Sequence, residues 1–240
     1  MLNKFGIDEV FVIHARHGSE QRERWVKELF KQYDIPFQFI SEEDSVLPLE
    51  ELSTNYFPPN IRETLSKGVV LCTLSHFVCY EKIVKQQNAL TLIFEDDPCF
   101  LKDFHKRLER VTTEAKNLKK GFIISLERTT LQFPSWKKIR KGQYLYEAQK
   151  SRCAGAYLVD LNAASMMLES LKKEKCLKAI DIWHNIILQK GTINMYWSHP
   201  PLVEQASHNG KLHSQIQQSR SRFQWLVQKF YKMYILRWFR

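Results

Sequence analysis

Residues 91–97 read Thr-Leu-Ile-Phe-Glu-Asp-Asp, an apolar run that ends abruptly in three carboxylates. An uncharged, largely apolar segment of this length is typical of a buried strand, whose end would bring the acids to the carboxyl edge of a sheet, where α/β proteins bind ligands. Because adjacent anions repel one another, a divalent cation would stabilise them, and oxygen ligands favour Mg²⁺ or Mn²⁺ over Zn²⁺. A solvated acidic turn before Pro98 is the alternative, and this segment alone does not separate the two.

The composition is that of one globular domain, with 240 residues of which 44% are hydrophobic, and without low-complexity tracts or repeats. The five cysteines are odd in number and contain no C-x-x-C pair, which favours reduced thiols over a disulfide framework or a zinc knuckle. We recognise no signal peptide before the first apolar segment and no apolar run as long as a membrane span. A cytoplasmic protein is therefore expected.

Strand-like and helical segments alternate along the chain, which predicts an α/β fold with a mostly parallel central sheet. Residues 129–152 are basic and aromatic without periodicity and are expected to form a long loop or lid, whereas residues 41–60 give no assignment. Asn162 is expected to cap the helix that follows it. The expected strands are residues 10–15, 35–40, 91–97, 121–127 and 154–159, and the expected helices are residues 20–33, 69–87, 103–119, 163–173 and 182–189.

Glycine-rich phosphate loops are missing from the sequence. No G-x-G-x-x-G follows the first expected strand, and no G-x-x-x-x-G-K-[ST] occurs anywhere. If the sheet binds a nucleotide, a metal held by carboxylates is the other way to neutralise its phosphates. This absence favours the metal-site interpretation of residues 95–97.

Several segments, taken together and in order, resemble glycosyltransferase family 25, which includes bacterial lipooligosaccharide galactosyltransferases and collagen galactosyltransferases. The most specific match is Ser75-His76 followed by Glu-Asp-Asp at residues 95–97. The segments that carry the resemblance are residues 10–14 with Arg22, and residues 68–76, 92–97, 155–159, 179–183 and 200–205.

The resemblance implies a GT-A fold, a nucleotide-binding α/β sandwich whose D-x-D-type motif holds Mn²⁺ or Mg²⁺ against the diphosphate of a sugar nucleotide. It also implies inverting transfer of galactose from UDP-galactose to an oligosaccharide acceptor. The expected organisation is a GT-A-like domain at residues 1–215 and a basic amphipathic helix at residues 216–240.

By the same resemblance, Asp97 is the expected direct metal ligand, because the last carboxylate of such a motif typically reaches the metal. Glu95 would be a second ligand or contact the ribose. A late histidine would be the third ligand, and His208 is our choice over His199 and His213. For each of these histidines taken alone, a simple surface position is the alternative.

The expected donor-binding residues are His14, Arg22, Ser75, His76, Glu95 and Asp96. The family's first strand usually ends in Ile-Asn-Leu, whereas this chain has Ile-His-Ala at residues 13–15. Arg22, and Arg24 beside it, are therefore the expected basic groups near the nucleotide. The alternative for Ser75 and His76 is purely structural, since a helical His among apolar neighbours is commonly a core residue and a helical Ser bonds back to its own helix.

Two carboxylates are candidates for the base that deprotonates the acceptor hydroxyl. Asp181 is flanked by apolar residues, and the neighbouring Trp183 offers a face for a sugar ring. Its alternative role is the N-cap of the following helix. Glu127, at the end of an expected strand, is the second candidate, and its alternative is a surface acid.

The C-terminal segment is basic and aromatic. Seven Lys or Arg and no acid fall in residues 205–240, out of a net charge of +10, and aromatic and aliphatic residues recur there at spacings of three and four. Such a helix would lie on an anionic membrane surface, which places the protein on the inner face of the cytoplasmic membrane with a lipid-linked acceptor. Packing against the catalytic domain or a partner helix is the alternative.

Two competing functions remain. A basic nucleic-acid-binding module would explain the charge but not three acids at the end of a buried strand, so no nucleic-acid partner is expected. A non-catalytic sugar-binding relative is the other alternative, against which the intact acidic motif argues.

Overall fold

A computed structural model describes residues 2–16 and 18–207. The predicted helix at residues 216–240 and the candidate ligand His208 lie outside the described residues. Within the described ranges, no helix combines the length and the apolar character that crossing a bilayer requires.

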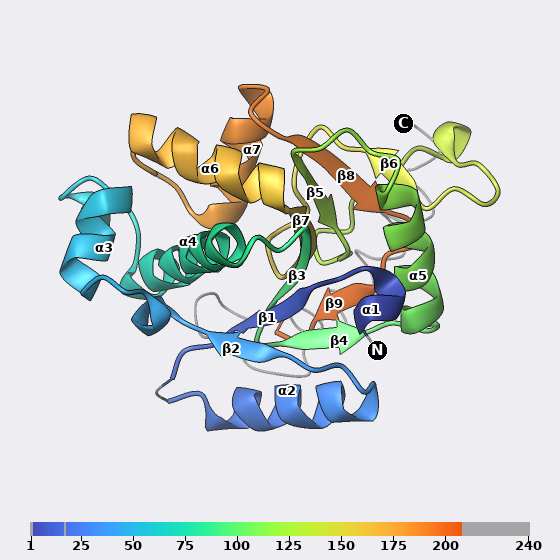
Figure 1. Ribbon diagram of the computed structural model, residues 1–240, viewed down its shortest axis with the longest axis horizontal. Coiled ribbons are helices and arrows are strands. Elements are labelled where there is room, and N and C mark those ends of the chain that lie inside the picture. Colours follow the sequence, from blue (N-terminus) through green and yellow to red (C-terminus); the bar gives the residue numbers. More distant parts are fainter. Residues whose placement is uncertain (1, 17, 208–240) are drawn as a thin grey trace.

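Seven of the described strands form the central sheet, in the order β2-β1-β3-β7-β5-β8-β6 (Figure 1). Strand β1 pairs parallel with β2 and β3, and β5 pairs parallel with β8, whereas β7 and β6 run antiparallel to their neighbours. Five strands thus share one direction, and the predicted α/β fold with a mostly parallel sheet is confirmed. The strands are β1 (Glu9–Ile13), β2 (Gln38–Ile40), β3 (Leu90–Glu95), β5 (Phe122–Ser125), β6 (Leu145–Glu147), β7 (Ala156–Asp160) and β8 (Asn194–Ser198), and a second sheet holds β4 (Pro98–Phe100) and β9 (Val203–Gln205).

Helices cover both faces of the sheet, as expected for strands that are apolar on both sides. Alternate residues point to opposite faces, so that Val10 and Leu92 belong to one core and Phe11 and Ile93 to the other. The first core packs against α2 and α5, and the second against α4, α6 and α7 (Figure 1). The described helices are α1 (Leu2–Phe5), α2 (Glu20–Gln32), α3 (Leu49–Tyr56), α4 (Lys67–Gln86), α5 (Phe104–Ala115), α6 (Leu161–Lys173) and α7 (Ile180–Gln189), with short 3₁₀ helices at Glu42–Asp44, Ile61–Glu63 and Trp136–Lys138.

Strand β3 ends at Glu95, two residues before the predicted end, because Pro98 already begins the second sheet. In that sheet β4 and β9 are antiparallel, with Pro98 opposite Gln205. Asp96 and Asp97 therefore occupy the connection between the two sheets, at the carboxyl edge of β3. The β4–β9 pairing also brings Ser207, 110 residues later in the chain, against Asp97.

Two segments are more ordered than the sequence indicated. Residues 129–152, expected to be a loop or lid, contain strand β6, which pairs with β8 at the edge of the central sheet. Residues 41–60, left without assignment, contain α3. The predicted strand at residues 35–40 is confined to β2, its last three residues.

Helix α6 is capped by Asp160, the last residue of β7, and not by Asn162, so the predicted cap is wrong. The Oδ1 of Asp160 accepts a hydrogen bond from the backbone N–H of Ala163 (2.9 Å), whereas Asn162 is exposed in the first turn. The same carboxylate accepts hydrogen bonds from the backbone N–H groups of Gly121 and Phe122 (2.9 and 2.8 Å). Asp160 thereby joins β5, β7 and α6.

Replacing Asp160 by Ala should lower the free energy of unfolding by about 3 kcal/mol, because three backbone N–H groups lose their acceptor. Urea denaturation followed by circular dichroism measures the change. The matched control Asn162→Ala, at the rejected cap, should change the free energy by less than about 0.5 kcal/mol. Equal effects of the two substitutions would contradict the assignment.

Candidate active site

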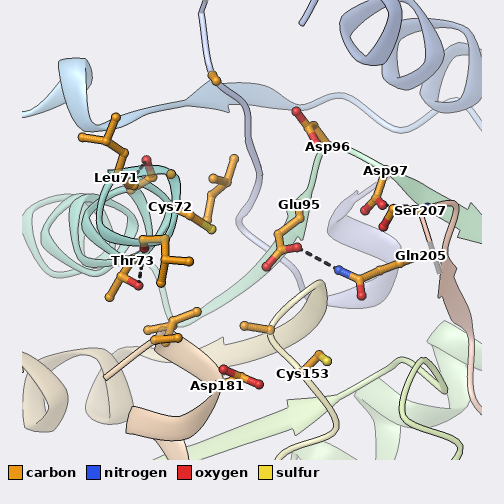
Figure 2. A pocket seen from close by; sticks show the side chains of 18 of the residues that line it. Leu71, Cys72, Thr73, Glu95, Asp96, Asp97, Cys153, Asp181, Gln205 and Ser207 are labelled. Atoms are coloured by element: carbon orange, nitrogen blue, oxygen red, sulfur yellow. Dashed lines mark hydrogen bonds between the residues drawn. The ribbon is translucent and has the colours of Figure 1, made fainter. Parts of the chain in front are cut away.

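A cavity of about 400 Å³ opens at the carboxyl end of β3. Figure 2 shows Glu95 near its centre, with Cys72 of α4 on one side and Gln205 on the other. The first turn of α7 contributes Asp181, and the segment after β9 contributes Ser207. The cavity therefore lies where a sheet of this class is expected to bind its ligand.

The described residues that line the cavity are strongly unbalanced in charge. Five are acidic, and Arg22 is the one Lys or Arg among them. Such a concentration of carboxylates in a partly closed cavity favours the binding of cations. The acidic residues are Glu42, Glu95, Asp96, Asp97 and Asp181.

The crowding of acidic residues changes the pKa of Glu95. A quarter of its side chain is exposed. Burial, followed by repulsion from Asp97, Asp96 and Asp181, raises the pKa of Glu95 to about 8. Its Oε2 accepts a hydrogen bond from Gln205 Nε2 (2.8 Å), and its Oε1 lies 3.7 Å from His76 Nε2.

Asp96, in contrast, forms an ion pair with Arg22 and contacts His14. Its Oδ2 lies 2.8 Å from His14 Nδ1, and its Oδ1 accepts a hydrogen bond from Arg22. His14 is buried at the end of β1 and does not line the cavity, whereas Arg22 does. Arg24, also expected near the nucleotide, is exposed and is not among the lining residues. Of the two predicted basic groups, the structure brings Arg22 alone to the site.

Asp97 is held from the backbone. Its Oδ2 accepts a hydrogen bond from the N–H of Ser207 (3.0 Å), and its carbonyl accepts one from the N–H of Ala206 (2.7 Å). Arg22 Nη2 lies 3.9 Å from the same Oδ2. The side chain is 3% exposed, yet it lines the cavity. The β4–β9 sheet therefore fixes the position of Asp97.

Ser75 and His76 occupy different places. Ser75 lines the cavity, where its Oγ lies 3.1 Å from Glu42 Oε2 and 2.9 Å from the Leu71 carbonyl. His76 is completely buried behind Glu95 and does not line the cavity. Burial lowers the pKa of His76 to about 3, so its imidazole is neutral at physiological pH.

The two candidate bases also differ. Asp181 lines the cavity in the first turn of α7, partly exposed, and accepts a hydrogen bond from the N–H of Ile182 (2.9 Å). Helix α7 begins at Ile180 with Ala179 as its N-cap, so Asp181 does not have the alternative role of cap. Trp183 is 4% exposed and packs edge-on against Phe77, so the prediction that it offers a face to a sugar is wrong.

Glu127 lies behind the cavity and does not line it, with no exposed surface. Its Oε1 accepts a hydrogen bond from the Gly155 N–H (2.9 Å), and the Gly155 carbonyl accepts one from the Glu95 N–H (2.9 Å). Burial raises the pKa of Glu127 to about 8. Geometry therefore favours Asp181 as the group that meets a substrate.

A family model described as glycosyltransferase family 25 (LPS biosynthesis protein) matches residues 7–183. The chain belongs to glycosyltransferase family 25. Similar proteins include procollagen galactosyltransferase 1 of Danio rerio, 28% identical over 83% of this chain and 34% of its own length, and a probable inactive glycosyltransferase 25 family member 3 of Bos taurus, 30% identical over 82% and 34%. This family 25 chain thus spans about a third of the length of these curated relatives.

The residues of the site that were not predicted include Gln205, Gly155 and Cys72. Gln205 reaches Glu95 because residue 155 is glycine, and a Cβ there would clash with the Gln205 amide. The role of both residues depends on contacts between distant parts of the chain, which leave no local pattern. Cys72 did leave one, because its spacing of four from His76 puts both on the same face of α4.

Replacing Glu127 by Gln should stabilise the protein increasingly as the pH rises from about 5 to 8. In wild type, the unfolded chain loses this proton near the ordinary pKa of 4.5 while the folded protein keeps it to about 8, so the free energy of unfolding falls across that window. The difference between variant and wild type should grow by at most about 1.4 kcal/mol per pH unit.

Urea denaturation at pH 5, 6.5 and 8, values inside the window of about 4.5 to 8, measures this difference. Glu147→Gln, at an exposed position, controls for the loss of one carboxylate. A Glu127→Gln effect that does not change with pH would contradict the protonation of Glu127 in the folded protein.

Proposed function

We propose that this family 25 member is a metal-dependent, inverting glycosyltransferase of the GT-A type that transfers galactose from UDP-galactose to an oligosaccharide. The main support for the proposal is the excess of acidic residues in the cavity. Five acids and Arg22 are the charged groups among its described lining residues. A diphosphate would be repelled from this cavity unless a cation accompanied it. The membership of the family supports the reaction class.

The donor set fits Mn²⁺ or Mg²⁺, because Asp97 and Glu95 offer carboxylate oxygens to a cavity with an excess of negative charge. Asp97 would be the direct ligand, fixed in place by the Ser207 N–H. The ion, when bound, supplies Lewis-acid stabilisation of the charge on the departing UDP. Arg22, oriented by Asp96, would contact the diphosphate beside it.

Asp181 is the proposed general base, because it lines the cavity and remains partly exposed to an incoming acceptor. It would take the proton of the acceptor hydroxyl as that oxygen bonds to the anomeric carbon. The bond from this carbon to the diphosphate oxygen breaks in the same step. A single displacement of this kind inverts the anomeric configuration and needs no covalent enzyme intermediate.

The proposed acceptor is a lipid-linked oligosaccharide of lipopolysaccharide or lipooligosaccharide, and residues 216–240 would hold the protein on the inner face of the cytoplasmic membrane. The description of the family model, which names LPS biosynthesis, supports this acceptor. Relatives named as procollagen galactosyltransferases support galactose as the donor sugar and offer procollagen as the competing acceptor. A panel of both acceptor classes would separate them.

Substituting Asp181 by Asn should lower turnover of UDP-galactose by about 100-fold or more with little change in donor affinity, because a general base acts on the acceptor. Release of UDP in the presence of Mn²⁺ measures turnover, and calorimetry measures donor affinity. Asp103→Asn, at an exposed position on the far end of the β4–α5 connection, is the matched control and should keep full turnover.

Retention of full turnover by Asp181→Asn would contradict its role as base, and a loss in Glu127→Gln instead would identify Glu127. Some relatives are named as inactive, so a sugar-binding protein without activity is the second candidate. It would bind UDP-galactose and release no UDP with any acceptor of the panel, which would contradict the proposed transfer.

A further inference from the structure

Cys72, His76 and Glu95 meet at the wall of the cavity. Cys72 and His76 are one turn apart on α4, and Glu95 approaches them from the end of β3. One potential ligand atom from each lies within 4.8 Å of the other two. In the described part of the chain, no other group of three His, Cys, Asp or Glu residues meets this condition. In particular, Glu95, Asp96 and Asp97 do not converge in this way.

The imidazole of His76 has one ring nitrogen that is buried and, within the described ranges, without a partner. Its Nε2 has no hydrogen-bond partner among the described residues, although the side chain is completely buried. A buried nitrogen left without a partner costs about 1 to 3 kcal/mol of stability. The nearest carboxylate oxygen, Glu95 Oε1, is 3.7 Å away, which is too far for a hydrogen bond but suits two ligands of one ion.

The other ring nitrogen of His76 is held by a buried chain of hydrogen bonds. Nδ1 lies 2.7 Å from the Tyr157 hydroxyl, which lies 2.8 Å from the Tyr80 hydroxyl, which in turn lies 2.7 Å from His184 Nε2. Burial raises the pKa of both tyrosines and lowers that of His184 to about 3, so all four groups are neutral.

This chain can be satisfied with its protons pointing in either direction. If each donor points away from the cavity, His76 donates through Nδ1–H to Tyr157, and the lone pair of Nε2 faces Cys72 and Glu95. A ligating histidine in proteins is typically held in this way, with its second ring nitrogen donating to a neighbour. In this arrangement of the protons, the ring is oriented as metal coordination requires.

We infer that Cys72 Sγ, His76 Nε2 and a Glu95 carboxylate oxygen form a binding site for one Zn²⁺ ion, with the fourth coordination position open to the cavity. Thiolate, imidazole and carboxylate together select Zn²⁺ over the hard ions Mg²⁺ and Mn²⁺. On binding, the S–Zn bond forms as the thiol proton of Cys72 passes to solvent. Glu95 is shared with the metal site of the proposed glycosyl transfer, but Cys72 and His76 have no part in that mechanism, so the inference does not depend on it.

The site differs in chemistry from the one proposed at Asp97 and shares Glu95 with it. Glu95 lies between them, with Oε1 near His76 and Oε2 bonded to Gln205. Asp97 belongs to the β4–β9 side and does not take part in the three-residue group. An ion bound by sulfur and nitrogen on α4 would therefore leave Asp97 free to bind a harder ion.

Titration of the full-length, metal-free protein with Co²⁺ tests the site independently of activity, because a cobalt–thiolate bond gives a charge-transfer absorption band. Wild type should bind one Co²⁺ with this band, and one equivalent of Zn²⁺ should abolish it, whereas an excess of Mg²⁺ should not. Cys72→Ser should lose the band. Cys153→Ser, which removes the other cysteine that lines the cavity, is the matched control and should keep it.

Tyr157→Phe removes the partner of His76 Nδ1 while leaving all three ligands, and it should weaken Co²⁺ binding by about 10- to 100-fold with the band retained. If circular dichroism shows that Cys72→Ser does not fold, Tyr157→Phe still tests the inference. Absence of the band in wild type, its persistence in Cys72→Ser, or unchanged affinity in Tyr157→Phe would each overturn the inference.

Discussion

Repulsion among carboxylates at the end of β3 is the constraint on which the site depends. The fold brings five acids to one cavity and pairs Asp96 with Arg22, while His14 contacts the same carboxylate. The remaining repulsion acts on Glu95, because burial and its acidic neighbours raise the pKa of this carboxyl to about 8. Asp96 and Asp97 are buried and Glu95 is partly buried, so keeping these acids together lowers the stability of the fold. Perturbed carboxylates of this kind cluster at functional sites.

Long-range pairings, rather than local sequence, hold the acids in place. The β4–β9 sheet places Ser207 against Asp97 and Gln205 against Glu95. Gly155 connects the cavity-lining Glu95 and the buried Glu127 through its carbonyl and N–H, and leaves room for Gln205. Helix α4 contributes Ser75 and Cys72 to the cavity. In the core behind the cavity, the hydrogen-bonded chain of side chains that ends at His184 begins at His76 of the same helix.

Much of this architecture follows from local pattern. Strands β1 and β3 and helices α2 and α4 were predictable, because their apolar periodicity is long and unbroken. The three-residue strands β4, β6 and β9 were not, because so short a segment pairs only through contacts with distant residues. The Asp160 cap was missed for a related reason, since the residue also bonds to β5, which the local sequence around Asn162 cannot indicate.

The same distinction between local sequence pattern and contacts with distant residues applies to the site. The sequence pointed to Glu95, Asp97 and Asp181, and all three line one cavity, whereas Glu127 and His76 are buried behind it. We propose that this cavity binds a nucleotide diphosphate through a divalent ion at Asp97. Calorimetric titration with UDP tests it most directly. Binding should weaken by roughly tenfold or more when EDTA replaces Mn²⁺, and Asp97→Asn should lose this dependence on metal. Equally tight binding of UDP by wild type in EDTA would contradict the account.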